Sequence, residues 1–124
     1  MNKLFTPYDL AGTSLKNRVV MAPMTRTRTL NNIPNDSNAL YYAQRASAGL
    51  LITEGLPISD EARGYLYTPG IYTKDHLPGW RKVTDAVHAK GGKIFAQLWH
   101  VGRMSHVSVH GIIPVSSGTI PAVD

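Results

Sequence analysis

Polar and aromatic side chains gather at the end of one apolar run in this sequence. Residues 93–99 read Lys-Ile-Phe-Ala-Gln-Leu-Trp, and His100 and Arg103 follow shortly after. A short apolar run bounded by glycines is typical of a buried strand, and ligands of α/β enzymes bind outside the carboxyl ends of parallel strands. Gln97 and Trp99 are therefore candidates for ligand contacts. The alternative is a core strand whose Gln and Trp merely fall at its end, and this segment alone does not separate the two interpretations.

Three histidines in the same region, His100, His106 and His110, raise the alternative of a metal site, because imidazole is a common zinc ligand. His106 and His110 lie in a stretch rich in glycine and serine with no carboxylate nearby. The sequence also has no cysteine, which excludes a disulfide framework and any thiolate metal site. We therefore predict no metal site, and the lack of cysteine fits a cytoplasmic protein.

The composition is that of one globular domain. The 124 residues are 43% hydrophobic and 17% charged, unlike disordered sequences. The formal net charge is +5, but the basic residues are scattered apart from Arg26-Thr27-Arg28, so we assign most of them to solvated surface and expect no nucleic-acid partner. We also expect no membrane association, because the sequence contains neither a membrane-spanning apolar run nor the apolar core of a signal peptide at its N-terminus.

The strands that must position these residues are predicted from apolar runs. Residues 3–16 read as a short hairpin, in which Leu4-Phe5 precedes Pro7 and residues 11–14 supply the turn. Continuous apolar runs at residues 18–24, 50–55 and 93–98 have the composition of strands buried on both faces.

Two helices are predicted between these strands, near residues 37–48 and 78–90, from apolar residues spaced i, i+3, i+4, i+7. Asp36 or Ser37 can cap the first helix, which we expect to run to about Ser47. Gly49 stands where a helix C-terminus favours a left-handed residue.

The order of these elements is strand, helix, strand, helix, strand. Strands joined through helices are parallel neighbours, so their carboxyl ends meet at one edge. A closed (β/α)8 barrel needs eight units and about 250 residues. We therefore predict an α/β fold made of the first three βα units of a TIM barrel, an incomplete barrel preceded by an N-terminal hairpin, with a small open α/β sheet as the alternative. Residues 1–124 form a single partial domain in this interpretation, and residues 101–124, which show no helical period, form a long loop after the third strand.

Four motifs follow one another along the chain in an order that is itself informative. They are Asn-Arg-Val-Val-Met-Ala-Pro-Met-Thr-Arg at 17–26, Tyr-Ala-Gln-Arg-Ala at 42–46, Leu-Ile-Thr-Glu-Gly at 51–55 and Gln-Leu-Trp-His-Val-Gly-Arg at 97–103. With these motifs the chain resembles the N-terminal part of the Old Yellow Enzyme family, the FMN-dependent ene-reductases, and within it the N-ethylmaleimide reductase-like branch. The resemblance covers essentially the whole chain, whereas family members run to several hundred residues.

The resemblance implies cofactor-binding roles for Pro23, Met24, Thr25, Gly55 and Gln97. The Thr25 hydroxyl would donate to the flavin O4 and tune the reduced ring, and Gln97, with donors and acceptors on one amide, would pair with the pyrimidine edge. Pro23, Met24 and Gly55 would offer backbone groups or a close approach to the ring. The alternatives are a Thr25 that caps the turn, a Gln97 that is a satisfied structural amide, and a Gly55 that simply ends a strand.

The resemblance also implies that Tyr65 and Trp99 are walls of the substrate pocket above the flavin. Arg26 and Arg103 would either hold phosphates or brace the barrel mouth. The family's substrate-anchoring pair, tyrosine proton donor and FMN phosphate site come from later strands, so we assign no catalytic residue here.

The function implied is an FMN-dependent oxidoreductase that uses NAD(P)H to reduce small activated alkenes, with this chain carrying only part of the flavin site. The alternatives are a different flavin- or metal-dependent barrel, an inactive truncated fragment, or a barrel segment that needs a complementary chain. Unpaired strand edges and exposed apolar strands promote association. For the isolated chain we therefore expect either self-association or a complementary barrel fragment as partner.

Overall fold

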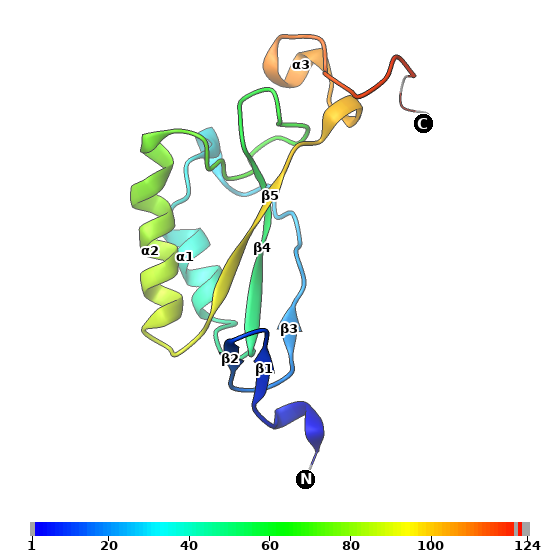
Figure 1. The fold of residues 1–124 in the computed structure, drawn as a ribbon. Helices are drawn as coiled ribbons and strands as arrows, with labels where there is room; N and C mark the ends of the chain where they lie inside the picture. The colour runs from blue at the N-terminus through cyan, green and yellow to red at the C-terminus, as the bar shows by residue number, and fades with distance from the viewer. Residues whose placement is uncertain (1, 121, 123–124) are drawn as a thin grey trace.

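Three parallel strands are the framework of the fold in the computed structural model, which describes residues 2–120 and 122. The strands are β3 (Val20–Met21), β4 (Leu50–Pro57) and β5 (Ile94–Trp99). β4 lies between the other two and pairs in parallel with both. The predicted parallel order is therefore confirmed, and the carboxyl ends of the strands point to the same edge of the sheet (Figure 1).

The first strand is much shorter than the apolar run at 18–24 predicts. Only Val20 and Met21 are paired with β4, and residues 22–29 have no regular secondary structure. Pro23 has no N–H to donate to a ladder, so pairing ends before it.

Both long helices lie on the same side of the sheet (Figure 1). They are α1 (Asp36–Ala43) and α2 (Leu77–His88), and the second agrees with its prediction to within two residues at each end. Their apolar faces and β4 form one core, made of Tyr42, Ala46, Leu51, Leu56, Trp80, Val83 and Val87. Burial of these side chains is what holds the helices on the sheet.

The first helix differs from its prediction at both ends. Its N-cap is Asn35, not Asp36 or Ser37, and the Asn35 side chain accepts a hydrogen bond from the Ser37 N–H at 2.9 Å. The helix ends at Ala43 and continues only as turns. Gly49 is absent from the residues with positive φ; glycine is needed there because a Cβ would overlap the Asn17 carbonyl.

The hairpin is confirmed, but with shorter arms than predicted. Its strands are β1 (Tyr8–Leu10) and β2 (Thr13–Leu15), which pair antiparallel around Ala11-Gly12. Leu4 and Phe5 belong instead to a 3-10 helix, η1 (Lys3–Phe5).

Short helical turns complete the described elements. They are η2 (Leu30–Asn32), η3 (Lys74–His76), η4 (Gly102–Met104) and α3 (Val107–His110). The last two lie within residues 101–124, the stretch predicted as a long loop after the third strand. No helix in the described part of the chain is both long and apolar enough to cross a membrane.

Candidate functional site

The carboxyl ends of β4 and β5 bring three of the predicted site residues together. In the ladder Gly55 is opposite Gln97, and Pro57 is opposite Trp99. Residues more than forty positions apart in sequence therefore lie side by side at one edge of the sheet, as the parallel order predicts.

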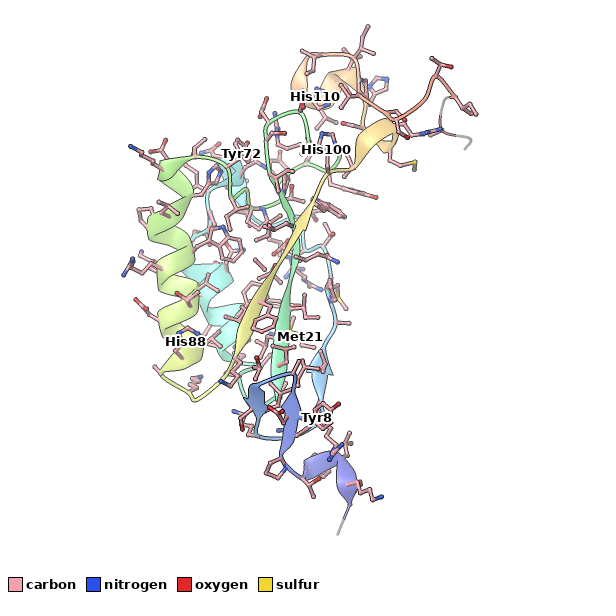
Figure 2. All side chains as sticks on the ribbon, viewed as in Figure 1. Tyr8, Met21, Tyr72, His88, His100 and His110 are labelled. Carbon is pink, nitrogen blue, oxygen red and sulfur yellow. The ribbon has the colours of Figure 1, made fainter. Side chains whose placement is uncertain are left out.

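The backbone of Gly55 also lies directly against the Trp99 indole. A Cβ on Gly55 would overlap the six-membered ring of the indole, so the absence of a side chain makes room for Trp99. Tyr65 stacks on the same indole, with ring centroids 5.7 Å apart and planes inclined by 20°. The indole Nε1 is buried and has no hydrogen-bond partner among the described residues. The two predicted pocket walls are thus one aromatic stack (Figure 2 shows their end of the sheet, near His100).

The ladder between β4 and β5 is irregular just before the site. The register shifts between Ile52 and Gly55, which leaves Thr53 and Glu54 out of step with β5. The Thr53 hydroxyl stands in for a backbone carbonyl at this point of the ladder, because it accepts the backbone N–H of Gln97 at 2.9 Å. A bulge of this kind re-aims side chains at the end of a strand.

Glu54 is a buried carboxyl group within this bulge, with 1% of its surface exposed. Its Oε2 accepts the backbone N–H of Arg26 at 3.0 Å, and its Oε1 accepts the hydroxyl of Tyr42 at 3.3 Å. Burial raises the pKa of Glu54 above its usual 4.5, and the bonds from Arg26 and Tyr42 oppose that shift without cancelling it. Burial and the nearby Glu54 carboxyl likewise raise the pKa of Tyr42.

Thr25 stands beside this network, since Arg26 is its neighbour in the chain. Among the described residues, none forms a hydrogen bond with the Thr25 hydroxyl or with the side-chain amide of Gln97. Both polar groups are only partly buried, and they are free to bind a ligand. Thr27 then turns the chain with a φ of 53°, a conformation that β-branched residues rarely adopt.

The remaining predicted residues of this segment, Pro23 and Met24, are exposed. The Met24 sulfur accepts a hydrogen bond from the Arg26 guanidinium at 3.1 Å, so Arg26 stabilises the loop to which it belongs. Arg103 also braces a loop, because its guanidinium donates to the Ile120 carbonyl at 2.6 Å.

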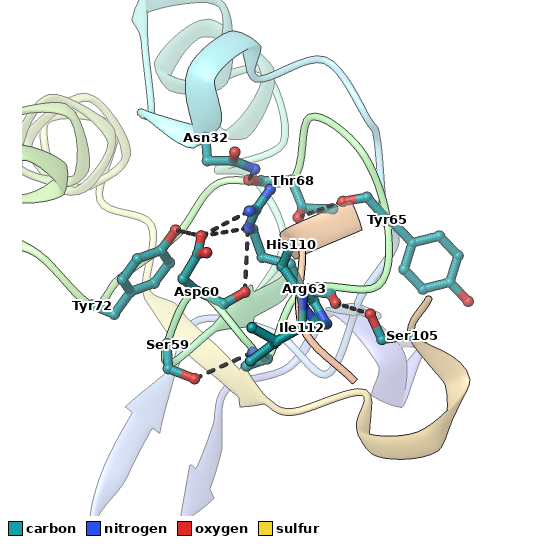
Figure 3. Close-up of polar contacts among 11 residues, drawn as sticks. Asn32, Ser59, Asp60, Arg63, Tyr65, Thr68, Tyr72, Ser105, His110 and Ile112 are labelled. Atoms are coloured by element: carbon teal, nitrogen blue, oxygen red, sulfur yellow. Dashed lines mark hydrogen bonds and ion pairs between the residues drawn. The ribbon is translucent and has the colours of Figure 1, made fainter. Parts of the chain in front are cut away.

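The loops after β4 and β5 are joined to one another, and this holds Tyr65 near Trp99. The Val101 N–H donates to the Ala62 carbonyl at 3.3 Å, and the Ser105 hydroxyl donates to the Arg63 carbonyl. Arg63 forms an ion pair with Asp60 at 2.8 Å. Figure 3 shows this cluster, in which the Tyr72 hydroxyl also reaches Asp60.

The histidines do not form a metal cluster with acidic or other histidine side chains within residues 2–120 and 122. His100 and His110 lie near the carboxyl edge of the sheet, whereas His88 lies at the opposite end (Figure 2). Each of His100 and His110 accepts a backbone N–H two residues further along the chain, so both stabilise local turns.

Sequence reasoning did not single out Thr53, Glu54 and Tyr42 as parts of the site. Tyr42 enters the sequence analysis only as the first residue of the motif at 42–46, and its hydroxyl reaches β4. A signal was present in the sequence: Glu54 is the one charged residue in a mostly apolar run at 50–57, and a buried charge needs hydrogen-bond partners.

Comparison with known proteins identifies the family of this chain. The profile of the NADH:flavin oxidoreductase / NADH oxidase family matches residues 3–117. This chain belongs to that family. The 12-oxophytodienoate reductase 7 of Oryza sativa subsp. japonica is 49% identical over 121 residues, which cover 95% of this chain and 31% of that protein.

Solved structures give the same result for the fold of this family member. Morphinone reductase in complex with tetrahydroNAD has a TM-score of 0.93 at 53% identity, over 97% of this chain and 34% of that one. An old yellow enzyme homologue from Zymomonas mobilis has a TM-score of 0.95 at 46% identity, over 98% and 35% of the two chains. The resemblance to the Old Yellow Enzyme family is therefore confirmed, whereas membership of the N-ethylmaleimide reductase-like branch stays a prediction. The chain spans about a third of the length of the relatives it matches.

Proposed function

We propose that this chain forms part of an FMN-dependent oxidoreductase that uses NAD(P)H to reduce small activated alkenes. The observation that carries the proposal is that Thr25 and Gln97, two polar side chains without partners among the described residues, both stand next to the carboxyl-terminal half of β4. Gln97 is opposite Gly55 in the ladder, and Arg26, the neighbour of Thr25, bonds Glu54. Ligands bind at this edge in barrels of parallel strands. Membership of a flavin oxidoreductase family adds the identity of the ligand.

The residues present fit one side of a flavin ring. Thr25 offers a hydroxyl donor and Gln97 an amide that donates and accepts, which suit the flavin O4 and the pyrimidine edge. Pro23, Met24 and Gly55 lie beside them along the same edge. FMN supplies the hydride chemistry when bound, and these residues bind it, orient it and set its electrostatics.

The Tyr65–Trp99 stack is the proposed wall of the substrate pocket. Two aromatic rings in contact offer a flat apolar surface. A planar enone or a nicotinamide ring matches such a surface. The relatives whose names state a substrate class are reductases, among them 12-oxophytodienoate reductase and morphinone reductase.

We also propose that β3, β4 and β5, with α1 and α2, are the first three βα units of a (β/α)8 barrel. The exposed side chains of β5 support this. Phe95 is 48% exposed and Leu98 is 61% exposed, although both stand in an apolar strand. The remainder of a barrel, in the same chain or in a complementary one, would cover them. The same exposure favours the second candidate, a segment that binds flavin only once such a partner is present.

A chimera tests the function. These 124 residues would replace the matching third of morphinone reductase, to which they are 53% identical. The purified chimera should carry FMN, seen as absorbance near roughly 450 nm, and should oxidise NADH in the presence of cyclohexenone. Loss of flavin upon Thr25→Val combined with Gln97→Leu would support the residues assigned here.

The control is Thr13→Val in the hairpin, far from the edge of the sheet where Thr25 lies. This variant should retain its flavin. A chimera that folds, judged by circular dichroism and gel filtration, but contains no flavin would refute the proposal.

A further inference from the structure

Two consecutive residues of the β4 bulge reach in different directions, one to β5 and one to the segment after β3. Thr53 bonds the backbone of Gln97, and Glu54 bonds the backbone of Arg26. Gln97 is itself a proposed flavin contact, and Arg26 directly follows the other proposed contact, Thr25. The bulge therefore connects the backbones of both segments through two adjacent residues of β4.

The Thr53 hydroxyl has a fixed orientation. It donates to the Glu54 carbonyl at 2.8 Å and accepts the Gln97 N–H at 2.9 Å. Thr53 is 2% exposed, so water does not compete for these bonds. A buried N–H without its acceptor would lose free energy, which ties the backbone of Gln97 to that of β4.

The Glu54 carboxyl group is fixed as well. One oxygen accepts the Arg26 N–H at 3.0 Å, and the other accepts the Tyr42 hydroxyl at 3.3 Å. The Tyr42 hydroxyl in turn accepts the Glu54 N–H at 2.9 Å. Since Tyr42 is fully buried in α1, it anchors Glu54 to the core. The left-handed Thr27 just beyond Arg26 is strained, and such a conformation persists only where its surroundings hold it.

We propose that Thr53, Glu54 and Tyr42 are positioning residues that fix Thr25 and Gln97 relative to each other, so that both can meet one flavin ring. This inference rests on the proposed function for what Thr25 and Gln97 bind. The three residues do not themselves contact the ring in this account. They act through the backbone amides of Arg26 and Gln97.

Amide hydrogen exchange of the full chain, measured by mass spectrometry with fragmentation to single residues, tests the positioning without any cofactor. Thr53→Val should speed exchange of the Gln97 amide about tenfold and leave the Arg26 amide unchanged, since one buried hydrogen bond is lost. Glu54→Ala should do the reverse, and Glu54→Gln should restore most of the protection at Arg26. The matched control is Thr84→Val, whose hydroxyl bonds only within α2.

An even rise in exchange over all core amides, including Val83 and Val87 of α2, would show a merely structural role and overturn the proposal. So would unchanged exchange at Arg26 and Gln97.

The second measurement uses the chimera with morphinone reductase. Thr53→Val and Glu54→Ala should each weaken FMN binding about tenfold, whereas Thr84→Val should not. A tenfold change corresponds to the loss of about one hydrogen bond between the flavin and a displaced Gln97 or Thr25. Selective amide changes without a change in FMN affinity would overturn the link to the flavin. If the unsubstituted chimera binds no FMN, the proposed function fails, and amide exchange alone then decides the positioning.

Discussion

The indole of Trp99 fills the space into which a side chain on Gly55 would project. The glycine at the end of β4 is therefore required by the protein's own packing. Tyr65 stacks on the same indole, so the proposed pocket wall depends on a residue that carries no side chain. A side chain added at Gly55 should displace the Trp99 indole and thereby also the Tyr65 ring that stacks on it.

Gly55→Ala should lower the free energy of unfolding by about 1–3 kcal/mol, the usual cost of overpacking a filled site. Urea unfolding of the chain at one fixed protein concentration measures this. Gly118→Ala, where a Cβ would meet nothing within 4 Å, is the control. In a Trp99→Leu background the cost of Gly55→Ala should shrink, and an equal cost in both backgrounds would contradict the contact.

Glu54 should make stability depend on pH. Burial raises its pKa in the folded chain above 4.5, so the folded state binds the proton more tightly than the unfolded state does. The resulting stabilisation is fully present below pH 4.5 and is lost as pH rises through the folded-state pKa. Relative to Glu54→Gln, the wild-type free energy of unfolding should therefore fall over that window. Urea unfolding of both proteins from about pH 4 to about pH 8 measures the difference, and a difference that is constant or rises would contradict the burial argument.

Thr25→Val should lower the midpoint potential of FMN in the chimera. A hydrogen bond to a charged group contributes about 1.5–3 kcal/mol, and about 1.4 kcal/mol corresponds to 30 mV for a two-electron couple. The expected shift is therefore roughly 30–60 mV to more negative values. Spectroelectrochemical titration measures it, with Thr13→Val as control. An unchanged potential would remove Thr25 from the flavin site.

Leu98 should drive association of the isolated chain. Leu98 is 61% exposed on β5, which is apolar apart from Gln97. We expect the chain alone to self-associate and to reduce no enone. Leu98→Asn should shift the chain toward monomer in sedimentation velocity. Leu40→Asn on α1 is matched in exposure, at 60%, and should change the association less. A wild-type monomer with robust turnover would contradict this expectation.

The order of the strands and the position of α2 could be predicted from the sequence because local patterns determine both. Apolar runs mark the strands, and the spacing of Trp80, Val83 and Val87 marks the buried face of the helix. The parallel pairing then follows from chain connectivity.

Features that depend on tertiary contacts could not be predicted in the same way. The early end of α1 at Ala43 and the need for glycine at position 49 both involve packing, in the second case against Asn17. The bulge at Thr53 and Glu54 is invisible in a one-dimensional pattern, because it exists only relative to β5. Tyr65 and Trp99 were each predicted as pocket walls, but their stacking requires the joined loops.

A crystal structure of the FMN-loaded chimera would show whether Thr25 and Gln97 bind the same flavin. We predict that the Thr25 hydroxyl and the Gln97 side-chain amide both lie within hydrogen-bond distance of one isoalloxazine ring, with the Arg26 and Gln97 amides still bonded to Glu54 and Thr53. A ring that contacts neither side chain, or that binds away from the carboxyl ends of β4 and β5, would contradict it.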